Sequence, residues 1–499
     1  MIPLKELSNT LSPENQVAFI HYLKVRNKRR DNKNLTLFKL LTQHDLDFTT
    51  IQKKLYKDQK KAAYHALRKR LYSSLIDFIA NKGMEEENSI EMQIIKLIIA
   101  SRNLLQQKQF NIAQKILKKA EKKAQDHFLF TLLNEIYHTQ IQYAHVFPET
   151  ALEHLIEKFN KNHQEHLNEE KLNIACARIK NKLNDFIAEG KKLDLNDFLE
   201  KNLKESNISI ETQTFKSLYQ LISLASLSAF TSKNYLSIET FVINTYNKIK
   251  SHKSNQKQLY YHIQINYLIA NMYFRNKKFQ LAIEFLDKME EQMKERKSQY
   301  FKIFDLKHKN LLALTHNYSG NIEKAIQIAE TGLKKITSDI ETKLDMQLCL
   351  VMYYFQKQEF NKANKILIQL YHTDKWYESK TGKEWVIKKS LIEILLHIEL
   401  NNIDIIESRL ISFKRKYYDY LKKIKQSRVI TFLSFIEEYY KCPEIIATDK
   451  YKQKIENSFV FLDPTEEDIF VISFYSWLKS KMKKENLYQT TIKLVNIYK

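Results

Sequence analysis

The sequence predicts an all-α fold: a right-handed α-solenoid of stacked antiparallel helix pairs, preceded by a small basic helical N-terminal domain. Only 5 Gly and 5 Pro occur in 499 residues, so the residues that tight hairpin turns and phosphate-binding loops require are scarce. Apolar residues make up 43% of the chain and recur at helical spacing, which indicates helices throughout. A chain of this length can bury a large core without disulfides or metal.

Residues 1–82 are the predicted basic N-terminal domain, with helices in "LSPENQVAFIHYLKVRN", "NKNLTLFKLLTQH" and "TTIQKKLYK" and a long fourth helix. Ser12 is the expected N-cap of the first helix, with Pro13 at its first position. Asp58 is the expected cap of the fourth helix, which should stop near Gly83. One face of this helix advances by three or four residues and should be buried, namely Tyr64, Leu67, Leu71, Leu75 and Phe78.

The same segment carries a local excess of positive charge. Between residues 22 and 72, Lys and Arg outnumber Asp and Glu by 15 to 4. Two clusters dominate, one with Lys24, Arg26, Lys28, Arg29 and Arg30 and the other with Arg68, Lys69 and Arg70. Arginine-rich clusters suit contacts with phosphate or carboxylate groups. We interpret them first as a solvated basic face, or as partners of carboxylates at Arg68 and Arg70; the alternative is a contact surface for nucleic acid or an acidic protein.

A short helix followed by a long basic helix resembles a helix-turn-helix or winged-helix DNA-binding unit. The acidic "GMEEENSI" follows this helix directly and leads into another helix, so no β-wing is expected. No residue in the segment identifies a side chain that would read base edges. The resemblance therefore implies nucleic-acid binding without base specificity.

The central part of the chain repeats one pattern around a small or apolar anchor in the second helix of each predicted pair. The clear anchors are Ala113, Ala282, Ala325 and Ala363, and the weaker ones are Ala151, Ile238 and Ile406. Three residues before the clear anchors stand Phe110, Phe279, Ile322 and Phe360, and four residues after three of them stand Leu117, Leu286 and Leu367. These offsets place all three positions on one helical face, so two antiparallel helices should cross closely at each anchor.

This pattern resembles the tetratricopeptide repeat (TPR) family, whose unit is a pair of helices of about 34 residues. The anchors at 238, 282, 325, 363 and 406 are spaced by 44, 43, 38 and 43 residues, and only the copy with Gly320 and Asn321 keeps a Gly-containing turn. We expect TPR-like repeats over residues 83–440, as lengthened, degenerate units or as another α-hairpin repeat. The alternative is an irregular all-α protein. Residues 165–205, with an anchor near Leu195, match least well.

Residues 441–499 are predicted to form C-terminal capping helices. Asp463 is a candidate N-cap, Pro464 would occupy the first helical position, and acidic residues follow in the first turn. Such a helix would cover the exposed apolar face at the end of the repeats. The last segment, "YQTTIKLVNIYK", is compatible with a helix or a strand.

No pattern typical of an enzyme or a metal site is found. His154, His163, Glu165 and His166 lie close in sequence, but no matching ligand pair occurs elsewhere. We therefore expect no catalytic residues, cofactor or metal. Catalysis would need a nucleophile with a placed base or paired carboxylates, and neither is recognisable.

The cellular location is predicted from three further features. Three scattered cysteines fit a reducing compartment. The N-terminus lacks a secretory apolar segment, and the longest apolar stretch, residues 469–478, is too short to span a bilayer. A cytoplasmic protein without a membrane span is expected.

Two functions remain open from the sequence. Stacked helix pairs form extended concave surfaces that bind peptides or proteins, which predicts a protein–protein interaction scaffold or adaptor. The alternative is a regulator in which the basic N-terminal unit binds nucleic acid while the repeats receive a partner.

Overall fold

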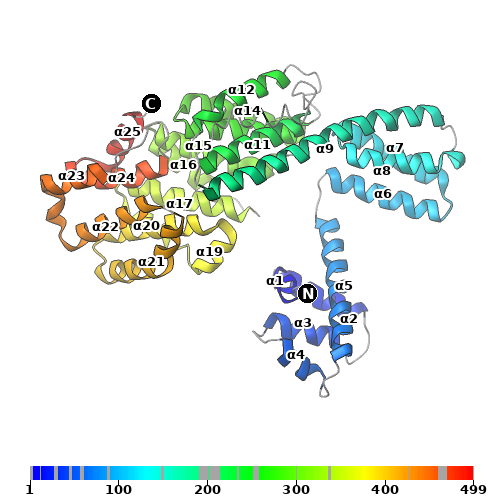
Figure 1. Ribbon diagram of the computed structural model, residues 1–499, viewed down its shortest axis with the longest axis horizontal. Coiled ribbons are helices and arrows are strands. Elements are labelled where there is room, and N and C mark those ends of the chain that lie inside the picture. The colour runs from blue at the N-terminus through cyan, green and yellow to red at the C-terminus, as the bar shows by residue number, and fades with distance from the viewer. Residues whose placement is uncertain are drawn as a thin grey trace. The chain divides into compact units, whose positions relative to one another are not determined.

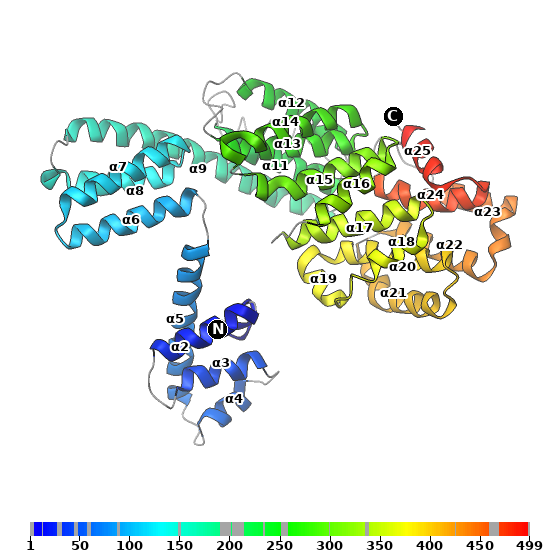
Figure 2. The same ribbon diagram turned by 180° about the vertical axis from the view of Figure 1, so that it is seen from behind.

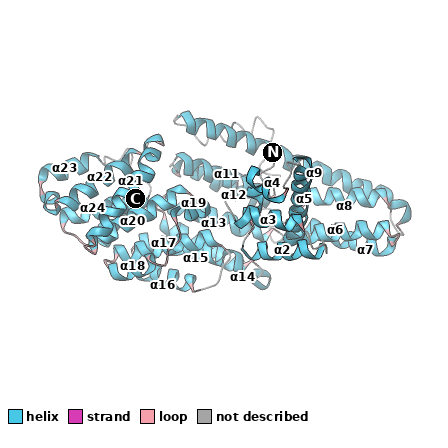
Figure 3. Ribbon diagram, turned by 90° about the horizontal axis from the view of Figure 1, so that it is seen from below, coloured by secondary structure: helices cyan, strands magenta, loops and turns pink. Residues whose placement is uncertain are grey.

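The computed structural model describes residues 4–11, 13–26, 32–43, 48–56, 61–86, 90–147, 151–189, 201, 214–232, 235–250, 258–298, 300–334, 339–424, 426–458 and 469–497. Every regular element within these ranges is a helix (Figure 3). The predicted all-α class is therefore confirmed. The chain divides into two compact units, Met1–Glu165 and His166–Lys499.

The first unit contains two separate hydrophobic cores. One core lies among α1 (Leu4–Asn9), α2 (Pro13–Arg26), α3 (Lys33–Gln43), α4 (Phe48–Leu55) and α5 (Lys61–Glu86). The other lies among α6 (Ile90–Gln106), α7 (Phe110–Asp126), α8 (Phe130–Gln142), η1 (Ala144–Val146) and the start of α9 (Leu152–Glu189).

The second unit is an array in which consecutive helices pack against each other (Figures 1 and 2). Its helices are α11 (Phe215–Ser232), α12 (Leu236–Lys250), α13 (Leu259–Arg275), α14 (Phe279–Ser298), α15 (Phe301–Tyr318), α16 (Ile322–Leu333), α17 (Ile340–Gln356), α18 (Phe360–Leu367), α19 (Asp374–Thr381), α20 (Lys383–Glu399), α21 (Ile403–Lys423), α22 (Ser427–Lys441), η3 (Pro443–Ala447), α23 (Asp449–Ser458), α24 (Ile469–Lys483) and α25 (Leu487–Ile497). The pairs α13·α14, α15·α16, α17·α18 and α20·α21 are four successive helical hairpins.

The anchors occupy the positions that the pattern predicts. Ala113, Ala282, Ala325, Ala363, Ile238 and Ile406 are all fully buried. The aromatic or aliphatic residue three positions before each clear anchor is the first residue of α7, α14, α16 or α18. At the four alanine anchors the small side chain lets the two helices approach closely.

The prediction at Ala151 is wrong. This residue is exposed and precedes the first residue of α9, so it is not a buried anchor at a helix crossing. The anchor expected near Leu195 lies outside the described residues.

The hairpins share one turn geometry. Lys108, Lys277, Gln358 and Asn401 have φ between 56° and 64°, and Gly320 has φ 105°. Each lies five residues before an anchor, and the next residue donates its N–H to the carbonyl five residues earlier, as in Gln109 to Leu104 at 2.9 Å. This is the Schellman arrangement that ends a helix with a left-handed residue, and four of the five turns form it with a residue other than glycine.

The basic N-terminal segment folds around its predicted apolar face. Tyr64, Leu67, Leu71, Leu75 and Phe78 are buried on α5. The helix continues through Gly83 to Glu86, beyond the expected stop. The proposed caps Ser12 and Asp58 lie outside the described residues.

The C-terminal helices pack on several hairpins. The hydroxyls of Tyr318 on α15 and Ser473 on α24 lie 2.7 Å apart, and Tyr488 of α25 donates to the carbonyl of Asn317 at 2.7 Å. Within the last segment, residues 488–497 are helical, and α24 and α25 contact elements more than 150 residues away. Asp463 and Pro464 lie outside the described residues.

Candidate binding surfaces

The basic clusters are only partly described, because Lys28, Arg29 and Arg30 lie outside the described residues. Lys24 and Arg26 are exposed in the last turn of α2. Nη1 of Arg26 donates to Oδ2 of Asp77 on α5 at 2.8 Å and to the Tyr22 hydroxyl at 2.7 Å. The hydrogen bond to Asp77 raises the pKa of Arg26. Part of the first cluster is therefore fixed against α5.

The second cluster lies along α5. Lys69 and Arg70 are exposed, and Nε of Arg70 donates to the Ala66 carbonyl at 3.4 Å. Arg68 is half-buried, with its guanidinium carbon 5.9 Å from the centre of the Tyr64 ring. Residues 61–76 contain no Asp or Glu. The solvent face of α5 is therefore basic over several turns.

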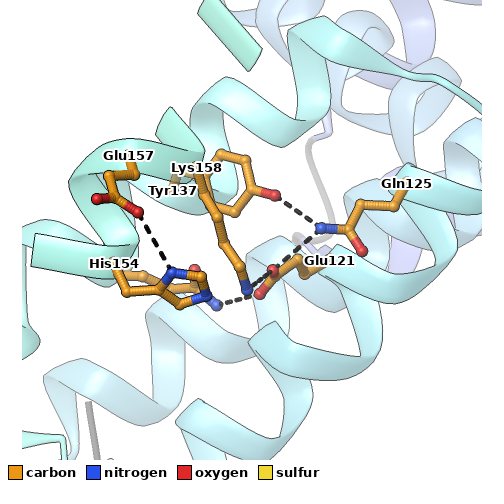
Figure 4. Close-up of polar contacts among 7 residues, drawn as sticks. Glu121, Gln125, Tyr137, His154, Glu157 and Lys158 are labelled. Atoms are coloured by element: carbon orange, nitrogen blue, oxygen red, sulfur yellow. Dashed lines mark hydrogen bonds and ion pairs between the residues drawn. The ribbon is translucent and has the colours of Figure 1, made fainter. Parts of the chain in front are cut away.

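A buried carboxylate joins α7, α8 and α9 (Figure 4). Oε1 of Glu121 lies 3.0 Å from the ammonium of Lys158, and Gln140 donates to its other oxygen at 3.1 Å. Gln125 donates to both Glu121 and the Tyr137 hydroxyl. Each oxygen of this carboxylate thus has a protein donor, which indicates a structural cross-link.

The histidines considered for a metal site lie along α9 in this region. His154 faces Glu157, with Nδ1 and Oε2 3.7 Å apart (Figure 4), and the ring of His163 stacks on Phe159. No group of three His, Cys, Asp or Glu in the described part of the chain is arranged to hold a metal ion.

A groove of about 850 Å³ lies in the second unit, and we call it the α18–α21 groove. Residues 364–374 form one side, and α20 with the first half of α21 forms the other. The groove arises because α18 ends after 8 residues whereas α21 runs for 21. Three large apolar side chains line it while facing solvent: Ile368 is 67% exposed, Tyr371 80% and Ile405 40%.

Charged groups line the same groove. Glu393 is buried between Lys389 and Arg409, at 3.1 Å and 3.0 Å respectively. The Asn402 amide donates through Nδ2 to Nδ1 of His397 at 3.0 Å, and burial lowers the pKa of His397. The groove therefore combines an exposed apolar strip with fixed charges, as protein interfaces do.

A second cavity of about 250 Å³ is lined by the first helices of the four hairpins and by α24, and we call it the first-helix pocket. Its polar lining residues are Tyr267, Asn271 and Arg275 on α13, Asn310 on α15, Asp345, Cys349 and Tyr353 on α17, and Trp385 and Lys388 on α20. Leu311, Leu314, Leu348, Met352, Ile392 and Phe474 are among its apolar residues. No single hairpin could form this pocket.

Burial perturbs the ionisable groups of the first-helix pocket. Burial is the main cause that raises the pKa of Asp345 to about 6. The negative charge of Glu341 adds to this shift, and the positive charge of Lys388 opposes it. Burial raises the pKa of the Cys349 thiol to about 12, and Lys388 and Arg275 act on it in the opposite direction. Both cations are therefore within electrostatic range of the same sulfur. A thiol with such a raised pKa is a poor nucleophile.

The sequence pattern did not predict either cavity. The first-helix pocket uses positions 7 to 21 residues before an anchor, from Arg275 before Ala282 to Trp385 before Ile406. The residues of α17 closest in sequence to the Ala363 anchor include Leu350, Val351 and Tyr354, which are buried. Polar residues on the adjacent stripe of successive first helices were the signal that was missed.

The comparisons with known proteins add no assignment: no protein-family model matches the chain, and a search of curated proteins finds no match. Within the described residues, no helix combines the length and apolarity needed to cross a bilayer.

Proposed function

We propose that this chain is a non-enzymatic protein–protein interaction scaffold or adaptor that holds a protein partner in the α18–α21 groove. The observation that carries the proposal is the exposure of Ile368, Tyr371 and Ile405 around one groove. Clustered exposed apolar side chains with a polar rim mark interaction sites on soluble proteins. The finer architecture is part of the same proposal: a cytoplasmic, right-handed solenoid of TPR-like units with a small basic N-terminal domain.

The chemistry of the groove indicates the kind of partner. Aromatic and aliphatic anchors contribute most to binding when neighbouring groups exclude water. Here the exposed apolar side chains of the groove are bordered by Asp374, Arg409 and Lys416, with both charge signs present. A protein segment with apolar anchors flanked by mixed charges would complement this surface.

Affinity capture from the source organism, followed by quantitative mass spectrometry, tests the proposal. The test variant is Ile368→Glu with Tyr371→Glu, and the control is Ile411→Glu, which changes an equally exposed residue of α21 outside the groove. A partner retained by the parent and the control but lost from the groove variant supports the proposal. A partner captured equally by all three proteins, or by none, contradicts it.

The basic face of α5 favours one alternative, a regulator whose N-terminal unit binds nucleic acid. Lys69 and Arg70 are exposed on a stretch without carboxylates, which suits contacts to phosphates. Filter binding with random duplex DNA at two salt concentrations tests it. Log K should fall by about 0.9 per phosphate neutralised for each tenfold rise in salt.

A variant that lacks four arginines of the two basic clusters tests whether these residues carry the DNA binding. Replacing Arg29, Arg30, Arg68 and Arg70 together by Gln should weaken binding and flatten the salt dependence. Absence of DNA binding by the parent at low salt, or unchanged binding by the folded variant, rules this alternative out.

A further inference from the structure

The first-helix pocket contains polar atoms that the surrounding protein does not satisfy. Trp385 is 7% exposed and Tyr353 1%. The indole N–H and Oδ1 of Asn310 have no hydrogen-bond partner among the described residues, and the Tyr353 hydroxyl lies beside the Cys349 thiol without ordinary hydrogen-bond geometry. The indole lies near enough to Asp345 to lower the pKa of that carboxyl, but without an ordinary hydrogen bond. Leaving such buried groups unsatisfied destabilises a folded protein, so their convergence on one cavity points to a ligand.

The charges around these atoms define the ligand's polar end. Arg275 and Lys388 approach the cavity from α13 and α20, and Asp345 is the carboxylate that lines it. Trp385 and Tyr353 both offer a hydrogen-bond donor. Two cations and two neutral donors favour acceptor oxygens that carry a negative charge, while the nearby carboxylate disfavours a dianion.

The remaining walls define the ligand's body. Leu311, Leu348 and Phe474 come from α15, α17 and α24, so apolar surface faces the cavity from several sides. The volume of about 250 Å³ lies below the range of about 300–1,000 Å³ typical of drug-sized ligand sites. The occupant must therefore be small and largely apolar.

We propose that the first-helix pocket binds a small organic monocarboxylate with an aliphatic or aromatic body. Its carboxylate would lie between Arg275 and Lys388 and accept hydrogen bonds from Trp385 and Tyr353. Its body would contact the apolar wall. This site is separate from the α18–α21 groove, so it stands or fails independently of the protein-binding function.

Isothermal titration calorimetry of the full chain tests the proposal with hexanoate, octanoate and phenylacetate, each compared with its neutral amide. At least one carboxylate should bind about tenfold or more tightly than its amide, because a charge-assisted hydrogen bond is worth about 1.5–3 kcal/mol. Two nearly isosteric variants change only the local charge. Asp345→Asn should tighten binding, and Asn310→Asp should weaken it by about tenfold.

The control is Lys380→Gln, which removes an exposed cation of α19 that does not line the pocket and should leave affinity unchanged. Circular dichroism confirms that each variant is folded. Binding of no carboxylate, equal binding of carboxylates and amides, or identical affinities in the Asp345→Asn and Asn310→Asp variants would overturn the proposal.

Discussion

The indole N–H of Trp477 donates to Oε1 of Glu399 at 2.6 Å, joining α24 to α20 across 78 residues of sequence. Lys481, one turn further along α24, lies 2.7 Å from the same oxygen. Trp477 is fully buried. Glu399 therefore satisfies a buried donor and a cation of the C-terminal helix at once.

Glu399→Ala should lower the free energy of unfolding by about 1–3 kcal/mol, because it leaves the buried indole N–H without an acceptor. Urea titration followed by circular dichroism measures the loss. Glu437→Ala is the control, since Glu437 pairs with half-exposed Lys414 and its loss should cost less than about 1 kcal/mol. Equal losses in the two variants would show that the Trp477–Glu399 contact does not stabilise the fold.

The anchors predict a second difference in stability. Ala282→Trp should cost about 1–3 kcal/mol, because a large side chain overpacks the crossing of α13 and α14. Ala151→Trp, at the exposed position that the repeat pattern assigned wrongly, should change stability by no more than about 0.5 kcal/mol. Thermal and urea unfolding of both variants measure this difference. A tolerated Ala282→Trp substitution would contradict close approach of the helices at this anchor.

The anchor pattern could be predicted from sequence because each packing position has a fixed local offset. Ala282 and Phe279 belong to one helical face, so their relation depends only on helical geometry. The turns were missed because Lys108 and Gln358 occupy left-handed backbone where glycine is expected. The first-helix pocket was missed because Asn310, Asp345 and Lys388 come from three hairpins, and their convergence depends on how successive hairpins pack.

The left-handed turns can be tested directly. Lys108→Gly should raise the free energy of unfolding by up to about 1 kcal/mol, since a left-handed conformation costs a non-glycine residue about 1–2 kcal/mol and the flexibility of glycine offsets part of that gain. Lys118→Gly, at an exposed position within α7, should instead cost about 1 kcal/mol. Comparable destabilisation by both substitutions, measured by urea titration, would argue against the shared turn geometry.

Asp345 makes stability depend on pH. Burial raises its pKa from 3.8 in a model peptide to about 6 in the folded chain, so the folded state holds the proton more tightly than the unfolded state. Its contribution therefore favours folding at low pH and is lost as pH rises through about 6.

Asp345→Asn removes that pH dependence. At neutral pH the variant should be more stable than the parent by about 1–2 kcal/mol, allowing for partial solvent screening, and the difference should shrink as the pH falls towards 4. Urea titrations across this range measure the difference. A constant difference between the two proteins at every pH would contradict a raised pKa for Asp345.

The most direct test of the scaffold function is amide hydrogen exchange, measured on the chain alone and in complex with the partner recovered by affinity capture. Binding in the α18–α21 groove predicts new protection in residues 367–374 and 402–409, which line opposite sides of that groove, and little change in α5. The Ile368→Glu and Tyr371→Glu double variant should lose this protection. Protection confined to the basic face of α5, or absent from both sides of the groove, would contradict the proposed binding surface.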